Sequence, residues 1–314
     1  MSENIFKVIR PGINTTFQDK GRSNLYHLGI PFSGAMDNRN YLLANKLVGN
    51  DLNNPVLEFA FQGPLLKYSG EKINLVITGD VSFKIKHNDN EIEGNCYETY
   101  EIYNEDEIDI LSTNKSVYGY LSIAGSFDVS YQWGSCSTNT KSNIGANNGL
   151  KLQDNQIIKI SKISNNFSKK KLNYINSKIE KIRVIKGTNF DYFSKTAISD
   201  FFEKEFKVSK LSDRMGMRLE GVKLENIKTS NIKSEGLIKG VIQVPGDGNP
   251  IIMLSDHGTI GGYPKIGVII SADYDRLVQI PPGSNIKFQQ VELSDAETLF
   301  KMYEMHTHNL ISQI

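Results

Sequence analysis

The chain has 314 residues, with 36 Lys and Arg against 35 Asp and Glu and a formal net charge of +1. This balance gives no global field that would attract nucleic acid or an acidic membrane surface. Hydrophobic residues make up 39% of the chain, and no apolar run reaches the roughly 18 residues of a membrane span. The composition therefore predicts a globular, cytoplasmic protein that binds neither nucleic acid nor membrane.

A polar turn and a helix open the chain. Gln18, Asp19, Gly21 and Arg22 are typical of a tight turn in which the aspartate braces a guanidinium. Such an arginine can bind a carboxylate or a phosphate at two points, and a structural Asp–Arg pair is an equal alternative. Further along, Asp37 is expected to cap a helix over 38–48.

Short segments bounded by Gly, Pro, Asn or Asp indicate many strands. Val81–Ile85 alternates apolar and polar residues, as in a half-buried strand. The other strand candidates are Leu75–Thr78, Tyr120–Ala124, Ile157–Ile160, Ile182–Ile185, Ile238–Val244, Ile251–Leu254, Val268–Ser271 and Ile286–Phe288. So many closely spaced strands favour β-barrels or sandwiches over a doubly wound α/β sheet.

Two further helices are expected in the C-terminal half. Thr188 and Asp191 predict a helical region that continues through Phe206. Ser294 and Glu297 form a capping-box pattern before a last helix.

A polar, lysine-rich segment over 161–181 indicates an exposed connection between domains. We therefore predict one domain over 1–165 and a second over 180–314. Cys96 and Cys136 have no metal-type spacing and are expected to be free thiols in a reducing compartment. No metal site is predicted.

Two loops in the middle of the chain carry candidate binding groups. Ser135 and Thr138 lie in a small, hydroxyl-rich loop that suits either an oxyanion site or an ordinary turn. Arg214 and Arg218 lie among Gly and acidic residues, which suits either anion binding or a buried ion-pair network. We favour the binding role for Arg214 and the structural role for Arg218.

The segment Gly236–Gln279 is the most informative part of the sequence, because strand-forming runs alternate there with Gly and Pro corners. Glycines at such corners let the backbone approach a ligand closely. The polar residues that we expect to bind substrate there are Gln243, Asp256, Thr259, Tyr263 and Gln279. The alternative is that the glycines form barrel corners and the polar groups satisfy the bends.

Several runs together resemble the family of the C subunit of 5-oxoprolinase, also described as allophanate hydrolase subunit 2. This family is similar to the carboxyltransferase region of biotin-dependent urea carboxylase. The matching runs are Thr16–Arg22, Gly29–Asp37, Ala44–Asn50, Glu58–Pro64, Ser212–Gly221 and Gly240–Gln279. They extend over nearly the whole chain.

The resemblance implies a mainly β chain with two cyclophilin-like β-barrel domains and a few short helices. It also implies the companion B and A subunits, with which the chain would hydrolyse 5-oxoproline, a small cyclic amide, to L-glutamate. ATP, bound with Mg²⁺ in the assembled complex, would activate the amide carbonyl by phosphoryl transfer. Arg22, Asp37 and Arg214 are the catalytic candidates, and we expect the polar clusters to meet around one anion-accepting hollow.

The chain departs from the family pattern at several positions. Cys136 and Leu150 stand where the family usually has arginine. Asp256-His257-Gly258-Thr259-Ile260 replaces the usual Asp-Arg-Gln-Thr-Thr. If those arginines hold an anionic substrate, this chain has a changed substrate or a reduced activity.

Two other functions remain open from the sequence. One is a carboxyltransferase subunit of a biotin-dependent urea or amide carboxylase. This function requires a separate biotin carrier, because the chain has no Met-Lys-Met motif. The other is a non-catalytic regulatory partner of a kinase inhibitor, which the substituted arginines suit.

Overall fold

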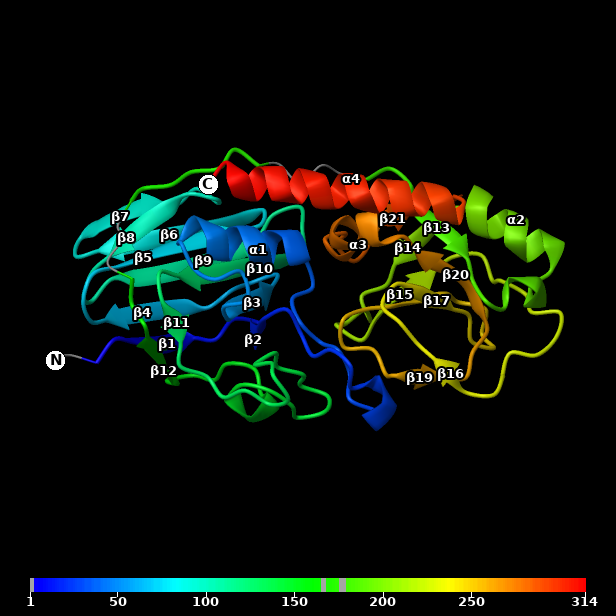
Figure 1. The fold of residues 1–314 in the computed structure, drawn as a ribbon, viewed down its shortest axis with the longest axis horizontal. Helices are drawn as coiled ribbons and strands as arrows, with labels where there is room; N and C mark the ends of the chain where they lie inside the picture. The colour runs from blue at the N-terminus through cyan, green and yellow to red at the C-terminus, as the bar shows by residue number, and fades with distance from the viewer. Residues whose placement is uncertain (1–2, 165–167, 175–178) are drawn as a thin grey trace. The chain divides into compact units, whose positions relative to one another are not determined.

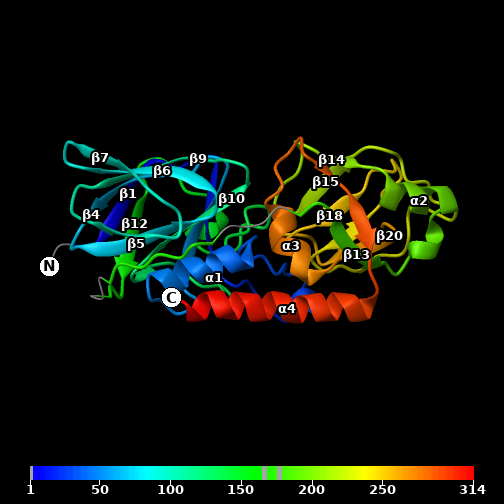
Figure 2. The same ribbon diagram turned by 90° about the horizontal axis from the view of Figure 1, so that it is seen from above.

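The computed structural model describes residues 3–164, 168–174 and 179–314. It divides the chain into two compact units (Figures 1 and 2). Unit 1 comprises Met1–Arg22, Asp37–Asn176 and Thr307–Ile314, and unit 2 comprises Ser23–Met36 and Ser177–His306. The sequence predicted domains over 1–165 and 180–314. In the structure, residues 23–36 belong to the second unit and residues 307–314 to the first.

Unit 1 is built from two antiparallel sheets. The larger sheet has the strand order β11 (Ser126–Phe127), β12 (Ile157–Ser161), β1 (Ile5–Arg10), β4 (Leu65–Ser69), β9 (Glu107–Thr113), β6 (Val81–His87) and β7 (Asn90–Glu93). The smaller sheet has the order β2 (Asn14–Gln18), β3 (Val56–Ala60), β10 (Tyr118–Ile123), β5 (Ile73–Thr78) and β8 (Thr99–Ile102). A 3₁₀ turn covers Asn147–Gly149.

Burial explains why these runs form strands. Every residue of β5 and β10 is buried, as expected for central strands covered on both faces. Helix α1 (Asn38–Leu47) contacts both strands. On β6, buried and partly exposed residues alternate from Val81 to Ile85, which confirms the half-buried strand read from the sequence.

Unit 2 centres on one larger sheet. Its strand order is β21 (Asn285–Ile286), β14 (Phe206–Val208), β15 (Gly216–Glu220), β18 (Ile251–Met253), β17 (Val241–Gln243), β20 (Lys265–Ile269), β13 (Ile182–Lys186) and β22 (Phe288–Gln290). A second, small sheet pairs β16 (Glu235–Gly236) with β19 (Ile260–Gly261). Phe201, Phe206 and Phe288 pack together in the core of this unit.

The helices of unit 2 are short, except for the last one. They are α2 (Lys195–Glu203), α3 (Ser271–Val278) and the 3₁₀ turns η1 (Tyr26–Leu28) and η3 (Phe190–Tyr192). The last helix, α4 (Leu293–Ser312), has 20 residues and belongs partly to each unit. Among the described residues, we find no helix whose length and apolar content would let it span a bilayer.

The mainly β class with two β-barrel domains is confirmed. Asp37 caps α1 as predicted, since its side chain accepts a hydrogen bond from the Asn40 amide. The predicted capping box at Ser294 is wrong. Helix α4 already begins at Leu293, because the Ala296 amide bonds the Glu292 carbonyl, so Ser294 lies inside the first turn.

Two other helix predictions need correction. The helical region expected from Thr188 through Phe206 contains a helix only over Lys195–Glu203, because the Ser194 side chain caps it through the Ala197 amide. Phe206 lies instead in β14. The strand expected over 268–271 ends at Ile269, and the helix α3, which the sequence did not predict, begins at Ser271.

The lysine-rich segment 161–181 falls partly outside the described residues, at 165–167 and 175–178. Its described part is not a purely exposed connection. The Leu172 amide bonds the Tyr97 carbonyl, and the Tyr97 and Tyr174 rings pack edge to face. Residues 168–174 therefore pack against unit 1, and Leu172 is buried there.

Candidate functional site

In unit 1, the loop after β11 folds onto Asp19. One Asp19 carboxylate oxygen accepts hydrogen bonds from the Ser135 and Ser137 hydroxyls, each at 2.6 Å, and from the Gly21 amide at 2.9 Å. The other oxygen accepts from the Cys136 amide at 2.8 Å. Burial alone would raise the pKa of Asp19, but these hydrogen bonds together lower it, so the cluster holds a buried carboxylate anion.

Arg22 binds the same loop. Its guanidinium donates to the Ser137 carbonyl at 2.7 Å and to the Gln132 carbonyl at 3.3 Å, and the residue is 2% exposed. Gly145 has φ of +97°, and a Cβ there would lie 2.0 Å from the Ser137 oxygen. The glycine is therefore required where the chain passes closely over this arginine.

Two other predicted residues lie at this loop with different partners. The Thr138 hydroxyl donates to the Ala146 carbonyl at 3.1 Å. The Cys136 thiol is fully buried, and this burial raises its pKa well above the ordinary value. The structure thus gathers Arg22, Ser135 and Thr138 around the loop, while Cys136 is held as an inert thiol.

Asp37, the other catalytic candidate in unit 1, has the contacts of a helix cap. One carboxylate oxygen accepts from the Asn40 amide at 3.0 Å, and the other accepts from the Asn40 side chain at 2.6 Å. The Asp37 amide donates to the Tyr120 hydroxyl at 2.7 Å. A catalytic role for Asp37 stays a prediction.

In unit 2, Arg214 and Asp256 form a two-point ion pair. The guanidinium Nε and Nη2 donate to the two carboxylate oxygens at 2.8 and 3.1 Å, and Nη2 also donates to the Gly34 carbonyl at 2.7 Å. Both residues are buried, at 7% and 4% exposure. The pair holds the turn before β15 to the turn after β18. A buried ion pair at Arg214 was one of the two alternatives that the sequence left open.

The remaining predicted residues of unit 2 lie in separate segments of the unit. Gln243 is buried and donates to the Tyr263 carbonyl at 3.1 Å, while the Tyr263 side chain is 40% exposed. A Cβ at Gly261 would lie 2.7 Å from the Gln243 side-chain amide, so a larger residue there would displace this side chain. Thr259 is half-buried, and Gln279 is buried at the end of α3. Their roles in binding substrate stay predictions.

Sequence reasoning missed a Tyr–His pair in unit 2. The Tyr26 hydroxyl lies 3.3 Å from His257 Nε2, and His257 Nδ1 lies 2.6 Å from the Gly258 carbonyl. Nδ1 must therefore carry the proton, which leaves Nε2 to accept from Tyr26. Burial lowers the pKa of His257, so the imidazole is neutral and can accept a proton. Its only sequence signal was the substitution of histidine for the family arginine.

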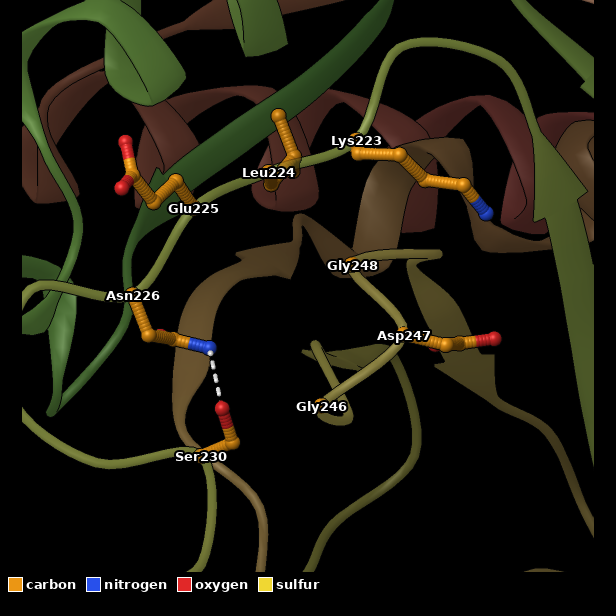
Figure 3. Close-up of a pocket in the computed structure, with 8 residues that line it drawn as sticks. All are labelled: Lys223, Leu224, Glu225, Asn226, Ser230, Gly246, Asp247 and Gly248. Carbon is orange, nitrogen blue, oxygen red and sulfur yellow. Dashed lines mark hydrogen bonds between the residues drawn. The ribbon is translucent and has the colours of Figure 1, made fainter.

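A small cavity of about 300 Å³ lies at the Gly246–Gly248 turn of unit 2. Figure 3 shows Asn226 and Ser230 facing Gly246 across it, while the charged ends of Lys223 and Asp247 point away. The Asn226 amide nitrogen bonds the Ser230 hydroxyl at 3.5 Å. The groups that face the cavity are therefore mostly neutral.

Arg22 and Arg214 belong to different units, so their meeting around one hollow stays a prediction. Neither arginine is part of a metal-binding group. Throughout residues 3–164, 168–174 and 179–314, we find no cluster of three or more His, Cys, Asp or Glu side chains that could hold a metal ion.

Comparison with known proteins shows what the chain is similar to. The family model described as carboxyltransferase domain, subdomain A and B, matches residues 28–290. The C subunit of 5-oxoprolinase from Escherichia coli (strain K12) is 33% identical over 296 residues, which cover 93% of each chain. The protein of the same name from Haemophilus influenzae is 30% identical over 292 residues, again 93% of each chain.

Solved structures give a second group of similar proteins. The urea carboxylase of Kluyveromyces lactis superposes with a TM-score of 0.89 and 28% identity. That match covers 99% of this chain but 29% of the carboxylase. The urea amidolyase of the same yeast gives the same TM-score and identity, and this chain covers 20% of it.

Proposed function

Because this chain belongs to the carboxyltransferase domain family, subdomains A and B, we propose that it is a subunit of an ATP-dependent 5-oxoprolinase. The complex would hydrolyse 5-oxoproline, or a closely related cyclic amide, to L-glutamate. The observation that carries this proposal is the match to the bacterial 5-oxoprolinase C subunit over 93% of both chains. In that relative, the match covers most of the length of one subunit.

The reaction needs an activated carbonyl. A lactam is a stable amide, so its carbonyl oxygen must be phosphorylated or otherwise polarised before water can attack. Phosphoryl transfer from ATP requires cationic and hydrogen-bonding groups around the transferred phosphate. The buried guanidinium of Arg22, which donates to a backbone carbonyl, supports this role within unit 1. A part for Arg214 in the transfer stays a prediction, because Asp256 engages its guanidinium.

Hydrolysis also needs a group that removes a proton from water. His257 is suited to this task, because its Nε2 is an unprotonated acceptor and the Gly258 carbonyl fixes the ring orientation. Tyr26 would donate to Nε2 in the resting state and release it to water when substrate binds.

The companion subunits are part of the proposal. Both bacterial relatives are named as one lettered subunit of 5-oxoprolinase, which supports an assembly with B and A subunits. ATP with Mg²⁺ would bind in that assembly, and the proposal assigns no metal ligand to the described residues of this chain.

The experiment is to purify the chain together with its companion subunits and to measure glutamate release from 5-oxoproline. We expect release only when ATP is present, with one product formed for each ATP consumed. A complete complex that consumes no ATP with 5-oxoproline would reject the proposal. Omission of this chain is the matched control.

A carboxyltransferase function is a second candidate, because a specific observation favours it. The Kluyveromyces lactis urea carboxylase covers 99% of this chain with a TM-score of 0.89. In this case, the chain would transfer a carboxyl group from carboxybiotin on a separate carrier to urea or another amide. A requirement for bicarbonate and for a biotinylated partner would identify this activity and exclude the first.

The regulatory function, as a non-catalytic partner of a kinase inhibitor, stays a prediction from the substituted arginines. Arg22→Ala and Arg214→Ala separate it from catalysis. If the chain is catalytic, both variants lose turnover in the assembled complex. If the chain is a regulator, both variants keep turnover and still bind the partner.

A further inference from the structure

Lys239 has an unusual environment in unit 2. It lies just before β17, and its ammonium sits 4.2 Å from the centre of the Tyr274 ring and 6.0 Å from that of Phe32. The residue is half-buried. Contacts of this kind hold an ammonium by attraction to the ring face, and they leave its N–H donors available.

In the described part of the chain, no carboxylate forms an ion pair with this ammonium. Among the described residues, Lys239 makes no ion pair within 4.0 Å and no side-chain hydrogen bond. Burial lowers the pKa of Lys239, the charge of Asp275 opposes that shift, and the charge of Arg214 adds to it. The Asp275 carboxylate accepts a hydrogen bond from the Tyr303 hydroxyl.

The neighbouring cation is already neutralised. Nε and Nη2 of Arg214 both donate to Asp256, and Nη2 also donates to the Gly34 carbonyl. Lys239 is therefore the cation of this region whose charge remains available to a ligand. The hydroxyl of Tyr274 lies 3.3 Å from that of Ser255, so the same side chain also carries a polar group.

We propose that Lys239 binds the carboxylate of a small-molecule substrate, with the ammonium positioned by the faces of Tyr274 and Phe32. This inference rests on the proposed function, since 5-oxoproline carries a carboxylate beside its lactam ring. A single ammonium matches the single charge of a carboxylate. A phosphate would require more donors and more charge than Lys239 supplies.

The direct test is protection of Lys239 from an amine reagent. The assembled complex is treated with trinitrobenzenesulfonate, and the peptide that contains Lys239 is quantified by mass spectrometry. We expect labelling that 5-oxoproline suppresses and that 2-pyrrolidone, the same ring without the carboxylate, does not. A lysine that is never labelled, or that is labelled equally with 5-oxoproline present, overturns the inference.

Kinetics of the same complex give an independent result. Lys239→Met removes the charge and keeps the length, and we expect it to raise KM for 5-oxoproline about ten-fold or more, with kcat little changed. Lys239→Arg should recover part of the loss. The matched control is Lys228→Met, because Lys228 also lies 4.2 Å from a tyrosine ring centre but is paired with Asp191.

These outcomes separate the two claims. A complex that releases glutamate normally with Lys239→Met and an unchanged KM contradicts the inference and leaves the proposed function intact. A wild-type complex that releases no glutamate contradicts the proposed function. The labelling experiment still decides whether 5-oxoproline reaches Lys239.

Discussion

The guanidinium of Arg214 binds both carboxylate oxygens of Asp256 inside unit 2, at 2.8 and 3.1 Å. The two residues are 42 positions apart in the sequence, and both are buried. The pair therefore joins two distant segments and holds an arginine that is a candidate for catalysis. Its first consequence concerns stability, because a buried charge that loses its partner is strongly unfavourable.

Asp256→Asn should destabilise the protein by about 3–5 kcal/mol, since the Arg214 charge would stay buried without a counter-ion. Urea unfolding followed by circular dichroism measures this loss. Asp89→Asn, in the exposed turn between β6 and β7, is the control and should have little effect. A loss below about 1 kcal/mol, as for an exposed pair, would contradict the account of this ion pair.

Asp19 should make unit 1 sensitive to acid. Its pKa in the folded state lies below the ordinary value of 3.8, so its stabilising contribution is present above that pH and is lost as the pH falls through the folded pKa. Asp19→Asn should lower stability near neutral pH and flatten the dependence on pH below about 4. Urea midpoints over this range test the prediction.

The control for Asp19 is Asp128→Asn, at an exposed position of the same unit. It should leave the acid dependence as in the wild type. If Asp19→Asn keeps the wild-type slope below the ordinary aspartate pKa, the hydrogen bonds from Ser135 and Ser137 do not stabilise the anion as described.

Asp37 can be tested as a cap by two substitutions. Asp37→Ala removes the acceptor for the Asn40 amide and should cost about 1 kcal/mol or more, whereas Asp37→Ser keeps an acceptor and most of the stability. Thermal unfolding measures both. Turnover in the assembled complex then separates the two roles. If Asp37 is catalytic, both variants lose turnover, because both lack the carboxylate. If Asp37 is only a cap, Asp37→Ser keeps turnover.

Both cysteines should be unreactive in the folded chain. Burial raises the pKa of Cys96 to about 11 and that of Cys136 well above its ordinary value, so little thiolate exists at neutral pH. A chromogenic disulfide reagent should label both thiols slowly in the native protein and promptly in urea. Rapid labelling of Cys136 without urea would show that its loop opens.

Local patterns were enough to predict much of the fold. Alternation in β6, the Asp37 cap and the Gly- and Pro-bounded strands are encoded by neighbouring residues. The start of α4 was misplaced by only one or two residues, because Ser294 and Glu297 imitate a capping box inside the first turn. Helix α3, which begins at Ser271, was not predicted, because the apolar run before it continues a strand pattern.

The arrangement of the candidate site could not be predicted from the sequence, because it depends on contacts between residues that are far apart in the chain. The sequence suggested Arg214 and Asp256 separately, but their pairing depends on how β15 and β18 lie together. Tyr26 and His257 are 231 positions apart, and no local pattern joins them. Lys239 is distinguished only by Phe32 and Tyr274, which come from two other segments.

The most direct test of the proposed function is the balance of ATP and glutamate in the assembled complex. With 5-oxoproline as substrate and with bicarbonate and biotinylated carrier absent, we expect ATP consumption and glutamate release at equal rates. Turnover that appears only with bicarbonate and a biotinylated carrier, or no turnover in the complete complex, would contradict it.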